Sequence, residues 1–276
     1  MIQSEITIAR GRIGFDELFW FGRQQAFSCI FGILLLGGLV LTKQWQPNGA
    51  LSRSDFLFLY AVSLQGALLA FRLEHRDELV VIFAFHVLAT LMEWFKTSPA
   101  IGSWQYPDTN VIFRIYQVPM FAGFLYSAVG SYIARAWRLF DFKFTGYPPL
   151  WTTIALAVLA YVNFFTHHFV PDFRWVLIAL SVAMFWKCEL FFRTGARYRQ
   201  MPLLIGLGMV ALAIWGAENI GTYVKAWSYP GQEAGWKPVS SQKFWAWYLL
   251  MMLSFVLVSL VHFRSHSLDD KSEKVA

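Results

Sequence analysis

Residues 202–224 read PLLIGLGMVALAIWGAENIGTYV, an apolar run that holds a single charged residue, Glu218. A helix of this length rises about 35 Å and covers the roughly 30 Å hydrocarbon core of a bilayer. Seven further apolar runs lie along the chain, at residues 26–41, 55–71, 79–95, 111–134, 150–165, 175–190 and 244–262. The sequence therefore predicts an all-α fold, a polytopic bundle of about eight transmembrane helices. The competing prediction is a seven-span bundle that lacks the short run 26–41.

Composition favours a protein that lies in a membrane. Hydrophobic residues make up 57% of the chain and charged residues 14%, a balance that is not typical of a soluble globular domain. The net charge of +6 comes from basic residues beside the apolar runs, where they suit an anionic membrane surface better than a nucleic acid. The expected partner is therefore the lipid bilayer, with no nucleic acid. No secretory signal peptide is expected before the first run.

Basic residues also predict the orientation of the helices. With eight spans, eight of the 23 Lys and Arg residues fall on the side opposite the N-terminus, and the others fall on the N-terminal side. Because positively charged loops remain in the cytoplasm, we expect an inner-membrane protein with both termini cytoplasmic. An odd number of spans would separate the positive clusters near the two termini, so the count favours an even number. Residues 265–276 are expected to form a disordered cytoplasmic tail.

A four-residue motif occurs twice and predicts an internal repeat. Residues 104–107 read WQYP and residues 227–230 read WSYP. With 13 Trp, 11 Tyr and 10 Pro in the chain, chance predicts about 0.02 copies of W-x-Y-P. A glutamate in an apolar run precedes each copy, Glu93 the first and Glu218 the second. We therefore predict one transmembrane domain of two tandem four-helix halves, related by an axis along the membrane normal, at residues 26–137 and 150–263.

The two glutamates are the candidate catalytic residues. A charge at the bilayer centre costs about 2.5–3.5 kcal/mol on insertion scales, so such a side chain usually faces a cavity or another helix. Burial favours the protonated carboxyl, which could act as a general acid on a substrate in the outer leaflet. The alternative is that both glutamates only join helices, by hydrogen bonds or by an ion pair with Lys96 or Arg114. The candidate substrate-binding residues lie near the glutamates in the sequence: His86, Trp104, Tyr106, Arg114, Asn219, Trp227 and Tyr229.

No metal or cofactor is expected from the histidines and cysteines. His167 and His168 are adjacent, so their side chains point in different directions on a helix and at most one of them would join a site. His262 and His266 are four residues apart, a spacing compatible with a metal or haem ligand pair. No matching cysteine or acidic pattern accompanies them, so a structural role is the stronger interpretation.

Two resemblances add to these predictions. His86, residues 92–97 (MEWFKT) and residues 104–107 (WQYP) resemble the YoaT-like family of bacterial integral membrane proteins over nearly the whole chain. This resemblance implies the membrane fold and transfers no activity. More distantly, the duplicated glutamate followed by an aromatic turn is similar to carotenoid cyclase and hydratase membrane proteins, which act on isoprenoid double bonds with intramembrane acids. The chain departs from their turn motifs, so this second resemblance supplies a reaction type alone.

Three functions remain open at this point. The first is an enzyme in which Glu93 or Glu218 protonates an apolar lipid, in particular an isoprenoid, between the two halves. The second is a membrane transporter, because parallel repeats and intramembrane acids are typical of transporters. The third is a non-catalytic membrane assembly protein. The two carboxyls should lie close together in one cavity if they form a shared site.

Overall fold

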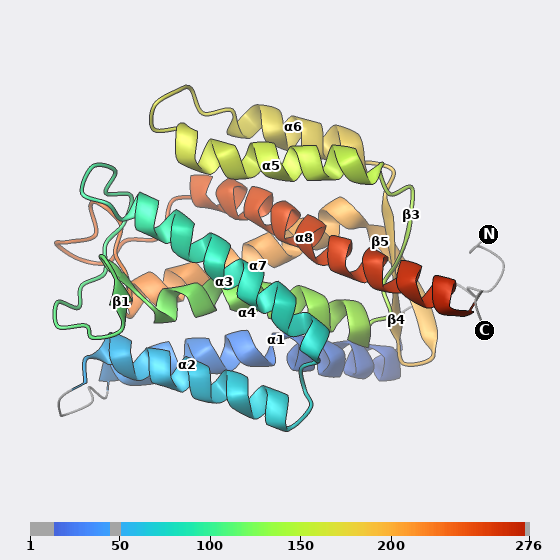
Figure 1. The fold of residues 1–276 in the computed structure, drawn as a ribbon, viewed down its shortest axis with the longest axis horizontal. Coiled ribbons are helices and arrows are strands. Elements are labelled where there is room, and N and C mark those ends of the chain that lie inside the picture. The colour runs from blue at the N-terminus through green and yellow to red at the C-terminus, as the bar shows by residue number, and fades with distance from the viewer. Residues whose placement is uncertain (1–13, 45–50, 274–276) are drawn as a thin grey trace.

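Eight helices form one bundle in the described part of the chain (Figure 1). The computed structural model describes residues 14–44 and 51–273, apart from the side chains of residues 44, 76, 77 and 263–273. Successive helices run in opposite directions, so the first residue of α1 and the last of α8 lie at the same end of the bundle (Figure 1). The helices are α1 (Phe15–Gln44), α2 (Arg53–Ala70), α3 (Arg76–Lys96), α4 (Phe121–Leu139), α5 (Leu150–Thr166), α6 (Arg174–Phe185), α7 (Leu203–Tyr223) and α8 (Gln242–Glu273).

Each predicted apolar run corresponds to one of these helices. Among the described residues, four helices are long and apolar enough to cross a membrane: Phe15–Lys43, Glu78–Lys96, Leu203–Tyr223 and Gln242–His262. The helices α5 and α6 are apolar but shorter. The surface of the bundle is apolar as well, since Phe83 on α3, Trp151 on α5 and Met209 on α7 are 70%, 73% and 59% exposed. Such a surface is typical of a protein covered by lipid.

The prediction of an all-α fold is wrong in detail, because two small antiparallel sheets close the ends of the bundle. A two-stranded sheet joins β1 (Arg114–Ile115) to β2 (Val118–Pro119). A three-stranded sheet in the order β3–β4–β5 lies at the opposite end, where α1 begins (Figure 1). We call this the sheet end, and we call the end that carries β1, β2 and both W-x-Y-P segments the turn end. The strands of the larger sheet are β3 (Lys143–Thr145), β4 (Glu189–Thr194) and β5 (Arg197–Pro202).

Local interactions explain why the predicted runs 111–134 and 175–190 are helical only in part. The predicted run 111–134 begins with the β1–β2 hairpin, because Pro119 cannot continue a helical hydrogen-bond ladder and disfavours helix in the residue before it. Asp55 accepts hydrogen bonds from the backbone N–H groups of Phe113 at 2.8 Å and Ile112 at 3.0 Å. The predicted run 175–190 ends in β4 because Gly195, with φ of +60°, makes the turn of the β4–β5 hairpin. A short apolar run can be a strand or a helix end, and periodicity does not distinguish them.

The final helix is longer than predicted. It continues to Glu273, past the predicted end at residue 262. Residues 274–276 of the predicted disordered tail, 265–276, lie outside the described chain, and the cytoplasmic tail stays a prediction. No glycine or proline occurs between residues 242 and 273 to end the helix. Within the bundle, α4 packs against α1 and α3, and α8 packs against α5 and α7.

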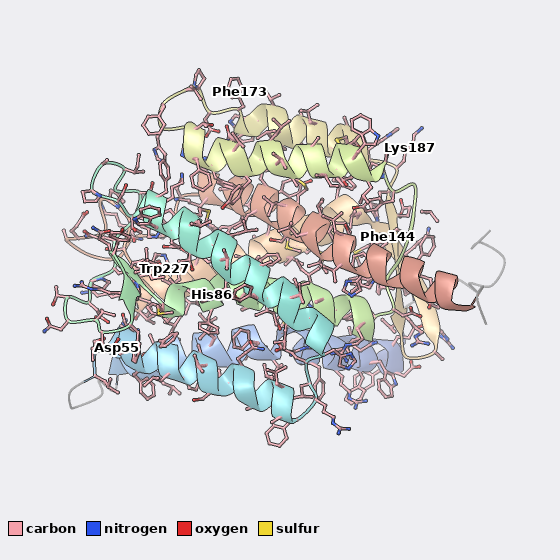
Figure 2. The ribbon with its side chains drawn as sticks, in the orientation of Figure 1. Asp55, His86, Phe144, Phe173, Lys187 and Trp227 are labelled. Atoms are coloured by element: carbon pink, nitrogen blue, oxygen red, sulfur yellow. The ribbon has the colours of Figure 1, made fainter. Side chains whose placement is uncertain are left out.

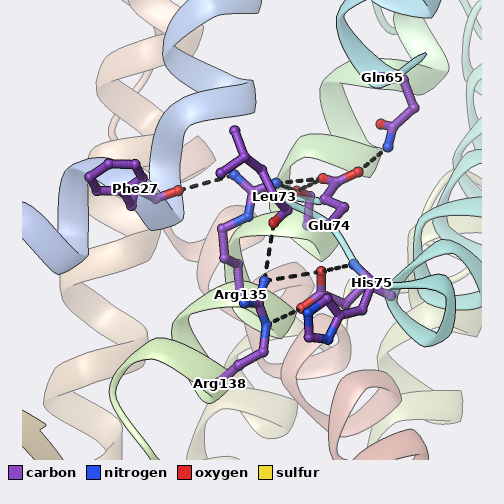
Figure 3. Close-up of polar contacts among 9 residues, drawn as sticks. Phe27, Gln65, Leu73, Glu74, His75, Arg135 and Arg138 are labelled. Carbon is purple, nitrogen blue, oxygen red and sulfur yellow. Dashed lines mark hydrogen bonds and ion pairs between the residues drawn. The ribbon is translucent and has the colours of Figure 1, made fainter. Parts of the chain in front are cut away.

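A buried ion pair fixes the α2–α3 turn against α4 near the sheet end. Glu74 Oε1 accepts hydrogen bonds from Arg135 Nη2 at 2.7 Å and Ser131 Oγ at 2.5 Å (Figure 3). Arg135 Nη1 donates to the carbonyl of Phe27 on α1 at 3.0 Å, so the pair joins three parts of the bundle (Figure 3). Both side chains are at most 3% exposed. Arg135 therefore lies inside the bundle on α4 and does not contribute a loop charge.

Candidate functional site

The two W-x-Y-P segments lie against each other at the turn end. The N–H of Gln105 donates to the carbonyl of Ser228 at 3.0 Å, and the N–H of Ser228 donates to the carbonyl of Gln105 at 2.9 Å. This antiparallel bridge joins segments that are 123 residues apart in the sequence. The bridging residues lie between Trp104 and Tyr106 in one segment and between Trp227 and Tyr229 in the other. The bridge therefore brings these four aromatic residues into one buried region.

Glu93 accepts three hydrogen bonds from aromatic side chains. Its Oε2 accepts from Trp104 Nε1 at 2.9 Å and from the Tyr106 hydroxyl at 2.7 Å. Its Oε1 accepts from the hydroxyl of Tyr126 on α4 at 2.8 Å. The glutamate is 2% exposed, so these donors replace water around the carboxylate.

Glu218 on α7 has a matching environment. Its Oε1 accepts from the Tyr229 hydroxyl, and its Oε2 accepts from Nε1 of Trp247 on α8 at 2.6 Å. The tyrosine of each W-x-Y-P segment therefore binds the glutamate of its own half. The tryptophans differ, because Trp227 packs against the backbone of Gly221, and Trp247 supplies the indole N–H instead.

Aromatic contacts join the two glutamate environments into one closed ring of side chains. The rings of Trp104 and Tyr229 lie 6.2 Å apart, centroid to centroid, at 74°, and those of Tyr126 and Trp247 lie 6.0 Å apart. The Lys243 ammonium lies 4.2 Å from the Tyr229 ring centroid and interacts electrostatically with both carboxylates. We call the following six residues the carboxylate ring: Glu93, Trp104, Tyr229, Glu218, Trp247 and Tyr126.

The tyrosines of the two W-x-Y-P segments remain hydrogen-bond donors. Burial and the adjacent Glu93 carboxylate hold the pKa of Tyr106 well above its usual value. Burial and Glu218 raise the pKa of Tyr229 in the same way. Both hydroxyls therefore keep their protons and can donate hydrogen bonds to the carboxylates.

All six residues of the carboxylate ring line one cavity of about 580 Å³. The cavity lies between α1, α4, α7 and α8, and in the described part of the chain its only charged lining residues are Glu93 and Glu218. The rest of its wall is largely leucine, alanine, methionine, phenylalanine and similar residues. This volume lies in the range that is typical of pockets for small-molecule ligands. The cavity is therefore an apolar space with its acidic groups gathered near the turn end.

The cavity is open on one side, between α1 and α7. Ile33 on α1 and Met209 on α7 line it and are 56% and 59% exposed. These side chains therefore form a rim at which the cavity meets the apolar surface of the bundle. An apolar molecule in a surrounding bilayer could enter by this route without crossing water.

The structure brings most of the predicted residues together. Glu93, Trp104, Tyr106, Glu218, Trp227 and Tyr229 all line the cavity. Figure 2 shows Trp227 near the turn end, whereas His86 lies farther along the bundle on α3. The His86 ring packs against Gly123 and lies 4.9 Å from the Phe124 ring, outside the cavity lining.

Two other predicted substrate-binding residues lie away from the cavity. Arg114 is exposed on β1. Asn219 faces the loop before α8, where its Oδ1 accepts from the N–H of Val239 at 2.9 Å and its Nδ2 donates to the carbonyl of Trp215 at 2.8 Å. Both are absent from the cavity lining. Asn219 follows Glu218 directly in the sequence, but successive residues on a helix face different directions.

The histidines form no metal cluster in the described chain. No group of three or more His, Cys, Asp or Glu side chains that could hold a metal occurs among these residues. The Lys96 ammonium lies 3.3 Å from His167 Nε2 and 2.9 Å from His168 Nε2. His262 stacks on Trp137 at 4.7 Å between ring centroids, and the side chain of His266 lies outside the described residues.

Sequence reasoning missed three residues of the site. Tyr126, Trp247 and Lys243 lie 33, 29 and 25 residues from the glutamate that each faces. Tyr126 and Trp247 belong to apolar helices, where an aromatic residue is usually packing or a membrane-interface residue. One property of the sequence could have indicated them. The Tyr hydroxyl and the Trp indole N–H are polar groups, and such a group requires a hydrogen-bond partner when its helix is buried.

The comparisons with known proteins place the whole site inside a family match. A family model described as "Protein of unknown function (DUF817)" matches residues 17–255. A relative in Bacillus subtilis (strain 168), the uncharacterized protein YoaT, is 38% identical over 244 residues, which cover 88% of this chain and 90% of the relative. No solved structure matches the chain significantly. The predicted resemblance to YoaT-like proteins is therefore confirmed, and neither comparison bears on the carotenoid cyclase resemblance.

Proposed function

The chain belongs to the DUF817 family of proteins of unknown function, and we propose that it is a multi-pass membrane enzyme that acts on an isoprenoid lipid. The observation that carries this proposal is the pair of carboxylates at one end of an otherwise apolar cavity. A glutamate that only joins helices needs hydrogen-bond partners, but it does not need an adjacent cavity of about 580 Å³. The cavity therefore favours the enzyme over a non-catalytic assembly protein.

The proposed topology has eight passes through a bacterial inner membrane, with both termini on the cytoplasmic side. The shortest helix, α6, rises about 18 Å, less than the thickness of the hydrocarbon core. Exposed Trp175 and Trp186 lie at its two ends, as expected for residues at the two membrane interfaces. Local thinning of the bilayer can accommodate a short helix. The sheet end, with its basic strand residues, faces the cytoplasm in this topology.

We also propose that the two halves arose by duplication. Each half contributes four helices, one W-x-Y-P segment and one glutamate, and the tyrosine of each segment donates to the glutamate of its own half. The antiparallel bridge between Gln105 and Ser228 gives the paired segments a local two-fold relation. The site then lies between the halves, where repeat-built membrane proteins commonly place their ligands.

The proposed chemistry is proton transfer without a cofactor. One carboxyl of the Glu93–Glu218 pair carries a proton, and the other is ionised opposite Lys243, because two charged carboxylates in one apolar site repel each other. The protonated carboxyl adds its proton to one carbon of a double bond. The ionised carboxylate then removes a proton from a carbon next to the resulting cation, so that the double bond moves. Where a second double bond of the same lipid attacks the cation first, its π electrons form the ring C–C bond, and the carboxylate removes the proton next to the new cation. The reaction consumes no oxidant or reductant.

Aromatic side chains around the carboxylates suit the cationic intermediate. Trp104, Trp227 and Tyr229 line the same end of the cavity. Their faces attract a cation by about 0.5–2 kcal/mol each, more where water is excluded. Two of these rings already lie near a cation, since the Lys243 ammonium is 5.5 Å from the Trp104 ring centroid and 4.2 Å from that of Tyr229.

The test is an untargeted lipid analysis of host membranes that express the wild type, Glu93→Gln or Glu218→Gln. We expect a lipid change with the wild type that neither variant reproduces. The matched control is Glu78→Gln, on the same helix as Glu93, because Glu78 is buried but pairs with Arg138 away from the cavity. Folded yield is checked by size-exclusion chromatography. Identical lipid profiles for wild type and both variants would refute the enzyme, and a loss of proton flux in proteoliposomes without any lipid change would favour a transporter.

A further inference from the structure

Four phenylalanines line the cavity at the sheet end. The Phe140 ring lies 5.5 Å from the Phe21 ring, 5.8 Å from the Phe142 ring and 6.3 Å from the Phe192 ring, centroid to centroid. They come from α1, the C-terminal end of α4, the segment before β3, and β4. All four line the cavity. We call Phe21, Phe140, Phe142 and Phe192 the phenylalanine floor.

The distance from the carboxylate ring to this floor is longer than one leaflet of a bilayer. On α7 the cavity lining runs from Glu218 to Leu203, which corresponds to about 22 Å of helix. One leaflet contributes half of a hydrocarbon core of about 30 Å, or about 15 Å. An ordinary acyl chain, which fills one leaflet, would therefore leave part of the cavity empty.

We infer that the cavity selects its lipid by chain length: it takes a single apolar chain longer than one leaflet, and the phenylalanine floor sets the upper limit. This inference rests on the proposed function, because it assigns the reactive end of the lipid to Glu93 and Glu218. The rest of the lipid chain lies along α7 and ends at the phenylalanine floor. Phe192 is a specificity-determining residue in this arrangement, since its ring lines the sheet end of the cavity, lies 6.3 Å from that of Phe140 and is 9% exposed.

Phe192→Ala tests the floor, with Phe191→Ala as the matched control. The two residues are neighbours on β4 and are both buried, but only Phe192 lines the cavity. Each protein is purified from the same host, and its co-purified apolar lipids are extracted and measured by mass spectrometry. We expect Phe192→Ala to shift the retained chains toward greater length, and Phe191→Ala to retain the wild-type distribution.

Gly206→Leu tests the same idea in the opposite direction, and it keeps the inference falsifiable if Phe192→Ala does not fold. Gly206 lines the cavity on the first turns of α7. An added Cβ there meets only Met201 at 3.6 Å and Leu190 at 3.8 Å, which is ordinary contact. The leucine should fill space above the floor and shift the retained chains toward shorter length.

The outcomes separate this inference from the proposed function. If the wild type retains long apolar chains and neither Phe192→Ala nor Gly206→Leu changes their length, chain selection by the floor is wrong while lipid binding stands. If the wild type retains no apolar lipid, both the inference and the proposed function fail. Equal lengthening by Phe192→Ala and Phe191→Ala would also contradict the inference, since loosening of the sheet would then be the cause.

Discussion

Replacing Glu93 by leucine should destabilise the protein far more than replacing it by glutamine. Leucine removes the acceptor of three buried donors, namely Trp104 Nε1 and the hydroxyls of Tyr106 and Tyr126. An unsatisfied buried donor costs about 1–3 kcal/mol, so three of them cost about 3–9 kcal/mol. Unfolded helices in a membrane also find partners for their polar groups, which favours the lower end, about 3 kcal/mol.

Glutamine can keep all three hydrogen bonds. Its carbonyl can accept from Trp104, which can only donate, and from Tyr106, while its amide faces the Tyr126 hydroxyl, which can accept. We therefore expect Glu93→Gln to cost about 1 kcal/mol or less, because neutral hydrogen bonds replace charge-assisted ones while the buried charge is removed. The two variants have the same helix and nearly the same volume, so packing does not account for the difference.

The assay is thermal unfolding of the purified protein in detergent, followed by the loss of the monodisperse size-exclusion peak. At about 2–4 °C per kcal/mol for a chain of this size, Glu93→Leu should melt about 6–12 °C below the wild type. Met92→Leu, at a neighbouring buried position, controls for the introduction of leucine into this turn of α3. Equal melting temperatures for Glu93→Leu and Glu93→Gln would refute the hydrogen-bonded arrangement of the carboxylate ring.

Three further predictions concern packing and charge. Glu74→Gln should cost about 3–5 kcal/mol, because it leaves the buried guanidinium of Arg135 without its charge partner, and adding Arg135→Met should recover part of the melting temperature. Burial and the neighbouring lysine ammonium hold the pKa of His167 below its usual value, so its neutral ring stabilises the fold above about pH 6.5. This stabilisation should be lost as the pH falls below that value, and a pH series of melting temperatures for His167→Gln should lose this component. Gly221→Ala should destabilise by about 1–3 kcal/mol through overpacking against a tryptophan ring, whereas Gly216→Ala, with open space around it, should be neutral or gain up to about 1 kcal/mol in helix propensity.

The helices were predictable because each depends on a local property of the sequence. An apolar run of membrane length forms a helix wherever its backbone has no water to bind, and the eight runs correspond to eight helices. The strands were not predictable in the same way. The apolar residues 190–192 form a buried strand because β4 pairs with β3, which lies far away in the sequence, and with β5 across the turn at Gly195. The periodicity of the apolar run does not show this pairing.

The residues of the candidate site were also predictable only in part. The repeated order of glutamate, tryptophan, tyrosine and proline predicted which residues lie near the two carboxyls, and the cavity contains six of the nine residues named in advance. Tyr126 and Trp247 were not predictable, because their hydrogen bonds to Glu93 and Glu218 depend on how α4 and α8 pack. His86 was named because a spacing of seven residues puts it on nearly the same helical face as Glu93, but its ring packs against Gly123. Arg114 lies on a hairpin and Asn219 directly follows Glu218, and neither position determines whether the side chain lines the cavity.

An experimental density map of the wild-type protein in lipid nanodiscs shows directly whether Glu93 and Glu218 share a lipid-binding cavity. We expect one elongated density between α1, α4, α7 and α8. This density should begin within contact of Glu93 and Glu218 and end at Phe140 and Phe192. A map in which side chains fill this space, or in which the two carboxylates face separate surfaces, would contradict the claim that they share the acidic end of a lipid-binding cavity.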